Sequence, residues 1–379
     1  MTRKGATDAN MLDKLFGKKN ELGMPDTEES DKATAEAAAA RLAGEADVKQ
    51  REDRVGRYLK KYMDKMVFSE FSDSYMRNAG IYDLMKGVPV PLRREDKKVF
   101  QGGSGLKAMA LAENMAWVMG IDPHFKYTEH YVAFLLKLFN PKICDGILKK
   151  GRNLAEQNEL DQACIFFRAT LCINPTYMHG MYSYARVCRA MYLEGQGEKY
   201  IGRLKAEALD YFELLTEIHP RFAQAYYYLG YAYLNMGLYV KTQLAWQQFL
   251  KRSTHPKDKK EIKERLSQIE EPVEIEQGYN AVLAGRYKEG LFILEPFLQT
   301  RFKTWWPLSY YLGVCYARTG NDEKAIESFK RVLKMNGSHL ETMEELVELY
   351  ANMQDNENEE KYRKKIELIR KNIGSEQES

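Results

Sequence analysis

Apolar residues recur at helical spacing along most of the chain, and tight turns divide them into pairs of short helices. The clearest pair spans residues 306–337, with Thr319-Gly320-Asn321 at its turn. The small residues Gly313 and Ala325 let the two helix backbones approach closely. The larger residues Leu312, Tyr316 and Phe329 then fill the remaining space. One such pair cannot bury its own apolar face, so the pattern predicts further pairs stacked against it.

This segment resembles one tetratricopeptide repeat, a helix–turn–helix unit of about 34 residues with small and large positions at fixed offsets. Similar offsets recur from about residue 144 to residue 373. The resemblance implies an all-α fold, a right-handed α-solenoid of helical hairpins. Two departures stand out: residues 193–205 should lengthen one turn, and Pro296 should kink or shorten the helix that contains it.

The remaining composition suggests how the chain is divided. Residues 27–66 are rich in Ala, Glu, Lys and Arg and predict a helix. Gly102-Gly103-Ser104-Gly105 lacks the spacing of a phosphate-binding loop and is interpreted as a hinge. The predicted parts are a disordered tail (1–26), a helical N-terminal region with the Gly-rich hinge (27–105), a helical hairpin that is a degenerate repeat or a cap (106–142), the repeat superhelix with a C-terminal capping helix (143–373), and a second tail (374–379).

Bulk properties exclude several classes of function. The net charge of +3 over 379 residues disfavours a nucleic-acid-binding protein. No run of about 18 apolar residues is present, and the first residues lack the apolar core of a secretion signal. The five cysteines form no CxxC pair and are expected to be reduced thiols in the core. We therefore expect a cytoplasmic protein without a membrane span.

The sequence contains no pattern typical of an enzyme. Its six histidines are scattered, with no HExxH motif and no Cys/His cluster at metal-binding spacing. No GxSxG nucleophile motif occurs. We therefore predict a protein with no catalytic residues, no metal and no cofactor.

The resemblance also implies where a partner would bind. In the repeat family, the first helices of successive repeats line a concave face that takes a peptide or a partner's helix. Here the first-helix positions that point away from the second helices are rich in Tyr and Arg, two residue types that contribute strongly to binding energy. The predicted partner-binding residues are Arg152, Tyr182, Arg186, Arg189, Tyr227, Tyr231, Asn235, Tyr279, Tyr310 and Arg318. The alternative is that these tyrosines only fill space between adjacent first helices.

Chaperone-binding members of the family hold a C-terminal carboxylate with Lys and Asn at set positions, and this chain lacks that pattern. The favoured function is a non-catalytic scaffold or adaptor that binds a protein or peptide in the Tyr/Arg groove. One alternative is a structural protein that self-assembles into a homo-oligomer. Another is a regulator that responds to a peptide and acts through its N-terminal helical region.

Overall fold

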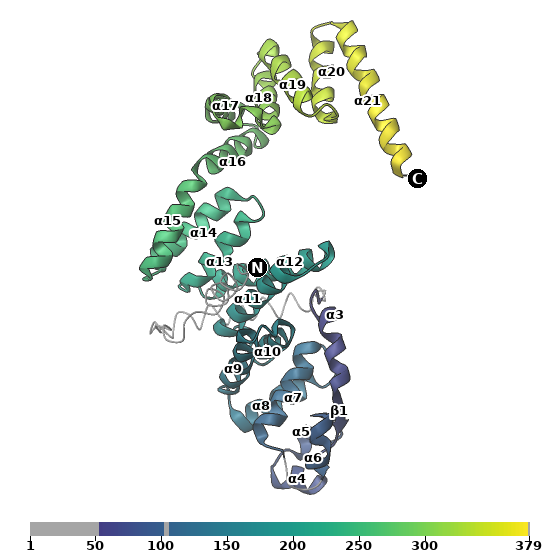
Figure 1. Cartoon of the computed structure of the whole chain (residues 1–379), viewed down its shortest axis with the longest axis vertical. Helices are drawn as coiled ribbons and strands as arrows, with labels where there is room; N and C mark the ends of the chain where they lie inside the picture. The colour runs from purple at the N-terminus through teal and green to yellow at the C-terminus, as the bar shows by residue number, and fades with distance from the viewer. Residues whose placement is uncertain (1–52, 102–105, 378–379) are drawn as a thin grey trace, which may run out of the picture. The chain divides into compact units, whose positions relative to one another are not determined.

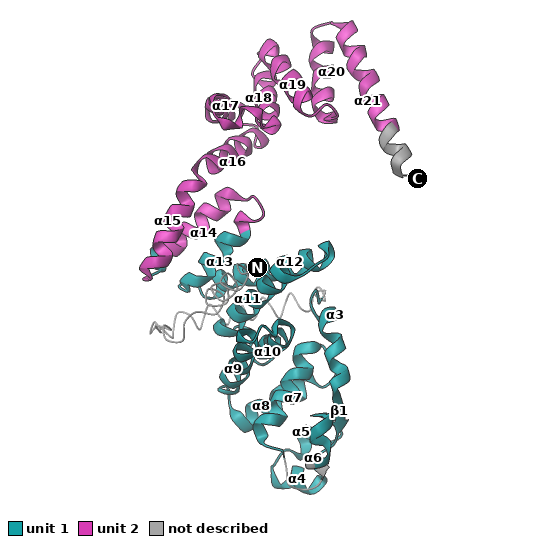
Figure 2. Ribbon diagram, in the orientation of Figure 1, with its two compact units in different colours: residues 1–232, 251–253 teal, residues 233–250, 254–379 magenta. Residues whose placement is uncertain are grey.

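The computed structural model describes residues 53–101 and 106–377 and divides the chain into two compact units (Figure 2). The first unit contains the chain up to Ala232 together with Lys251–Ser253. The second contains Tyr233–Leu250 and the chain from Thr254 onward. The predicted tail at 1–26, most of the predicted helix at 27–66 and the hinge at 102–105 lie outside the described residues.

The first unit begins with short elements and a small antiparallel sheet (Figure 1). In the sheet, Met66 lies opposite Arg93 and Ser69 lies opposite Val90. These two strands were not predicted within the N-terminal region, which was expected to be helical, and the all-α fold class of the chain stands. Pro89 and Pro91 favour extended backbone in the residues before them, which suits a strand of a two-stranded sheet. The elements are α3 (Gly56–Leu59), η1 (Lys60–Lys65), β1 (Met66–Ser69), α4 (Asp73–Asn78), α5 (Tyr82–Met85), β2 (Val90–Arg93), η2 (Arg94–Asp96) and α6 (Lys97–Gln101).

Longer helices follow in the first unit (Figure 1), and among them α9 and α10, and α11 and α12, form consecutive pairs, whereas α7 packs little against α8, its expected partner in the predicted hairpin at 106–142. α7 packs chiefly along α10, and α9 pairs with α10 as α11 pairs with α12. The insertion at 193–205 does not form a long loop, because α12 begins at Glu198 and absorbs most of it. The helices are α7 (Ala108–Ile121), α8 (Thr128–Phe139), α9 (Ile143–Glu156), α10 (Leu160–Ile173), α11 (Met178–Glu194), α12 (Glu198–Ile218) and α13 (Ala223–Leu234).

The chain from Asp53 to Lys65 crosses the second helices of this array. The Asp53 carboxylate accepts a hydrogen bond of 2.6 Å from Arg168 on α10, whose side chain is only 6% exposed. Arg54 forms an ion pair with Asp210 on α12, and Tyr62 donates its hydroxyl to Asp161 on α10. These polar contacts fix the N-terminal segment to α10 and α12.

The second unit continues the helix pairs after α14 and α15. α17 ends at Leu294 and passes into a 3₁₀ helix that contains Pro296, which confirms the predicted shortening. α21 continues to Gln377, beyond the predicted end at 373. The elements are α14 (Tyr239–Arg252), α15 (Pro256–Gln268), α16 (Glu270–Leu283), α17 (Tyr287–Leu294), η3 (Glu295–Gln299), η4 (Arg301–Thr304), α18 (Trp306–Arg318), α19 (Asp322–Met335), α20 (Leu340–Asn352) and α21 (Asn356–Gln377).

One close approach recurs in three helix pairs. A Cβ atom at Gly313 of α18 would lie 2.6 Å from the Phe329 ring of α19. A Cβ atom at Gly151 would likewise lie 2.6 Å from the Phe167 ring in the pair α9/α10. A Cβ atom at Gly278 would lie 2.5 Å from the Leu294 side chain in the pair α16/α17. Each glycine precedes its large partner by the same number of residues. The glycine on the first helix therefore makes room for the side chain that fills the interior of its own pair.

The cysteine thiols are free, and burial changes their chemistry. Burial raises the pKa of the Cys144 and Cys315 thiols to about 11 and that of the Cys172 thiol to about 12. Because the thiolate is the reactive form, we expect the folded protein to react only slowly with a disulfide reagent at pH 8. In urea the protein unfolds, and all five thiols should react rapidly. Rapid labelling of these three thiols in the folded state, measured by mass spectrometry of tryptic peptides, would contradict this.

Candidate functional site

Three of the predicted arginines lie near two tyrosine rings in the first unit. Arg186 on α11 is only 7% exposed, and its guanidinium lies 5.0 Å from the ring centre of Tyr182 and 5.2 Å from that of Tyr228. Arg189, one helical turn further along α11, lies 5.7 Å from the ring centre of Tyr228. The two arginines therefore contact the tyrosine that α13 brings next to α11.

Arg152 on α9 completes this group. The pKa of its guanidinium lies below the ordinary value, chiefly because burial disfavours the charged form, and the positive charge of Arg186 acts in the same direction. The negative charge of Asp145 acts to raise the pKa of Arg152, but the Asp145 carboxylate also accepts a hydrogen bond from the Tyr177 hydroxyl. The site thus concentrates positive charge on neighbouring helices.

The charges of Arg152 and Asp145 also act on His179, which lies on α11. Burial lowers the pKa of its imidazole, and the charge of Arg152 lowers it further. This histidine is therefore held neutral near pH 7. An anion bound beside Arg152 would favour the protonated imidazole and would raise this pKa again.

The sequence interpretation missed Tyr228, the residue that organises the site. It stacks on Phe212 of α12 with ring centres 5.5 Å apart, and it also contacts Tyr182 and Tyr227. Tyr227 in turn contacts Tyr231 at 5.2 Å, and both rings are half-buried. The sequence feature that could have indicated Tyr228 is the run Tyr226-Tyr227-Tyr228. Adjacent side chains on a helix project about 100° apart, so more than one of these rings can reach the same neighbouring helix. We call the resulting surface the arginine–tyrosine face; it comprises Arg152, Tyr182, Arg186, Arg189, Tyr227, Tyr228 and Tyr231.

The other four predicted residues belong to the second unit and have different surroundings. Arg318 on α18 forms ion pairs with Glu345 at 3.2 Å and Glu348 at 3.9 Å on α20, so carboxylates already engage its charge. Tyr310 contacts His339, and Tyr279 stacks on Tyr311 with ring centres 5.3 Å apart. Asn235 is exposed just beyond the end of α13.

The chemistry available at the arginine–tyrosine face is recognition of negative charge. Guanidinium groups bind carboxylates or phosphates through paired hydrogen bonds, and tyrosine rings supply apolar area with a polar end. Among the described residues, no group of three His, Cys, Asp or Glu side chains is placed to hold a metal ion. Within the same ranges, no helix has the length and apolar character that crossing a lipid bilayer requires.

Comparison with known proteins identifies the repeat. Residues 307–339, which span α18 and α19, match the tetratricopeptide repeat family model. Among solved structures, the chain is similar to MamA from Desulfovibrio magneticus RS-1, with 17% identity, 50% of this chain and 96% of that chain covered, and a TM-score of 0.33. It is also similar to the TPR domain of P58(IPK), with 22% identity, coverage of 59% and 60%, and a TM-score of 0.33. A third is YrrB, described as a TPR protein with an unusual peptide-binding site, with 16% identity, coverage of 56% and 96%, and a TM-score of 0.29.

A search of curated proteins found no match. Similarity at this level of identity concerns the fold alone. Gly313 faces Phe329 inside the matched repeat, as Gly151 faces Phe167 in α9/α10. Residues 307–339 therefore match one tetratricopeptide repeat, and two helix pairs before it share its contact between a glycine on the first helix and a large side chain on the second.

Proposed function

We propose that the protein is a non-catalytic scaffold that binds an acidic segment of a partner protein on the arginine–tyrosine face. The observation that carries this proposal is the contact of Arg186 and Arg189 with the rings of Tyr182 and Tyr228, with Arg152 close enough for the charge of Arg186 to lower its pKa. Tetratricopeptide arrays stack helix pairs into extended surfaces that suit protein partners. Arginine and tyrosine are enriched among the residues that dominate interface energies.

Two of these arginines have capacity for a ligand. Among the described residues, neither Arg152 nor Arg189 forms an ion pair with a carboxylate. The Nε atom of Arg189 is buried and has no hydrogen-bond partner. A buried donor without a partner is costly, so a carboxylate from a bound segment would recover that free energy. This supports an acidic segment rather than a basic or purely apolar one.

Selection from a random peptide library with the full chain tests the proposal. We expect the selected peptides to be rich in Asp and Glu and to bind more weakly as ionic strength rises. The double variant Arg152→Gln/Arg189→Gln should lower their affinity by about tenfold for each guanidinium removed, because charge-assisted hydrogen bonds are lost. Fluorescence anisotropy with a labelled peptide measures this change.

The matched control is Lys199→Gln/Lys205→Gln on α12, which removes the same charge from a second helix. It should leave the affinity unchanged. Selection of neutral or basic peptides would contradict the proposal, as would an unchanged affinity for the arginine variant with its circular dichroism intact. The hypotheses of self-assembly and of peptide-responsive regulation remain predictions, and light scattering of the full chain tests the first.

A further inference from the structure

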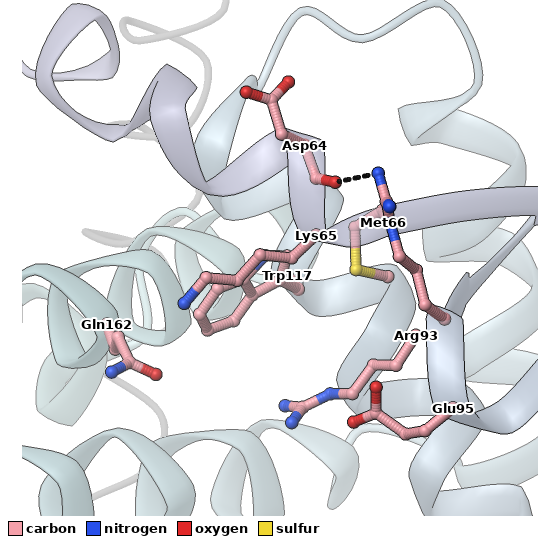
Figure 3. A pocket seen from close by; sticks show the side chains of 8 residues that line it. Asp64, Lys65, Met66, Arg93, Glu95, Trp117 and Gln162 are labelled. Carbon is pink, nitrogen blue, oxygen red and sulfur yellow. Dashed lines mark hydrogen bonds between the residues drawn. The ribbon is translucent and has the colours of Figure 1, made fainter.

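A cavity of about 380 Å³ lies beside the small sheet of the first unit (Figure 3), and none of the arginine–tyrosine face residues lines it. Its walls come from the end of η1, the start of β1, the end of β2, α7 and α10. The pairing of Met66 with Arg93 brings Lys65 and Arg93 to the same end of the sheet. The N-terminal segment and the repeat array therefore build this cavity together.

Three cationic and two acidic side chains line the cavity, and the cations Lys65 and Arg93 each lie near an aromatic ring. Lys65 lies 5.0 Å from the ring centre of Tyr62, and Arg93 lies 5.8 Å from that of Trp117. Among the described residues, neither cation forms an ion pair. Figure 3 shows both side chains extending into the open space from different walls. Two positive charges that face one hollow repel each other unless an anion lies between them.

The acidic residues nearby do not neutralise this pair. Figure 3 shows the Asp64 carboxylate directed away from the cavity, while the Asp64 backbone carbonyl accepts a hydrogen bond of 3.3 Å from Arg94. Glu95 lies beside Arg93 but forms no ion pair with it. The lining residues carry a net positive charge, and Lys65 and Arg93 form no ion pair, so the cavity matches a ligand group with negative charge.

The rest of the wall is fixed and offers a hydrogen-bond acceptor. The Trp117 indole donates to the Tyr62 carbonyl at 3.3 Å and meets the Tyr62 and Phe166 rings edge-on, which holds it in place. Gln162 donates its amide to Glu159 at 2.7 Å and turns its amide oxygen toward the cavity. That oxygen can accept from a ligand hydroxyl.

We propose that this cavity binds a small organic phosphate monoester, with its phosphate between Lys65 and Arg93 and its hydroxyl-bearing part toward Gln162. A phosphate monoester carries close to two negative charges at neutral pH, which matches the two cations. Arginine holds a phosphate oxygen pair in its fork, and lysine adds a point charge. The cavity volume falls within the range of about 300–1,000 Å³ that is common for small-molecule sites.

Isothermal titration calorimetry of the full chain with glucose 6-phosphate, inorganic phosphate and glucose tests this. We expect glucose 6-phosphate to bind more tightly than inorganic phosphate, and glucose to give no binding heat. Lys65→Gln/Arg93→Gln should weaken glucose 6-phosphate binding by about tenfold for each cation removed. The control Lys60→Gln/Lys97→Gln removes the same charge from exposed positions outside the cavity and should leave binding unchanged.

Absence of binding heat with glucose 6-phosphate would overturn the proposal. Equal affinities for glucose 6-phosphate and inorganic phosphate would overturn the monoester assignment. Equal affinities for the wild type and the Lys65→Gln/Arg93→Gln variant would also overturn it. If that double variant does not fold, Lys65→Gln alone supplies the test, because this side chain is exposed.

Discussion

Replacing Gly120 with alanine should destabilise the first unit by about 3 kcal/mol, toward the upper end of the cost of overpacking a core. Gly120 lies on α7, and a Cβ atom there would come within 1.9 Å of the Ile165 carbonyl oxygen and 2.7 Å of its carbonyl carbon on α10. A side chain could rotate away from such a clash, but a helix backbone cannot. α7 and α10 would therefore have to separate. Urea denaturation followed by tryptophan fluorescence measures the change.

Gly202→Ala is the matched control for this substitution. Gly202 lies on α12, and a Cβ atom there would meet nothing within 4 Å. Alanine favours an exposed helix over glycine by roughly 0.5–1 kcal/mol, so this variant should be more stable than the wild type. Stabilisation by both substitutions would show that helix propensity, and not the contact between α7 and α10, determines the result.

Removing the carboxylate of Asp53 should destabilise the first unit by about 3 kcal/mol, as expected when one partner of a buried ion pair is lost. In Asp53→Ala the Arg168 guanidinium keeps its charge and is only 6% exposed, but it loses its hydrogen bond of 2.6 Å. Asp210→Ala provides the comparison, because it removes one carboxylate partner of the more exposed Arg54, which also pairs with Glu207. That exposed pair should contribute at most about 1 kcal/mol. Equal losses for the two variants would contradict the predicted importance of the buried pair.

The dependence on pH gives a second measurement of the same pair. Burial acts to raise the pKa of the Asp53 carboxyl, but the charge of Arg168 and the backbone N–H groups of Gly56 and Val55 outweigh it and lower the pKa below the ordinary value. The stabilisation is therefore fully present above the ordinary pKa of an unfolded aspartate and is lost as pH falls through the lowered value. The difference in stability between wild type and Asp53→Ala should shrink over that acidic range.

The repeat array could be predicted from the sequence because its information is local. Gly313, Ala325 and Phe329 lie within one helix pair, and their spacing alone defines how the two helices meet. The strand at Met66–Ser69 could not be predicted in this way, because its partner begins at Val90 and the intervening residues form other elements. Pairing between distant segments leaves little trace in local periodicity.

The candidate site was predictable only in its residue types. The positions of Arg152, Arg186 and Arg189 on first helices follow from the repeat pattern. The ring that joins two of them, Tyr228, depends on how α13 rotates against α11 and α12. Likewise, Arg318 had the right residue type but pairs with Glu345 on the following first helix. Neighbours that come from separate repeats therefore determine which arginines retain capacity for a ligand.

The N-terminal segment also affects how many partners the first unit can engage. Asp53 and Tyr62 hold this segment against α10, and Arg54 holds it against α12, so the chain itself occupies part of the second-helix side. The arginine–tyrosine face lies on the first helices α9, α11 and α13. If this face is the binding surface proposed above, we expect a partner to form a one-to-one complex with the protein, because the residues of the face form one surface.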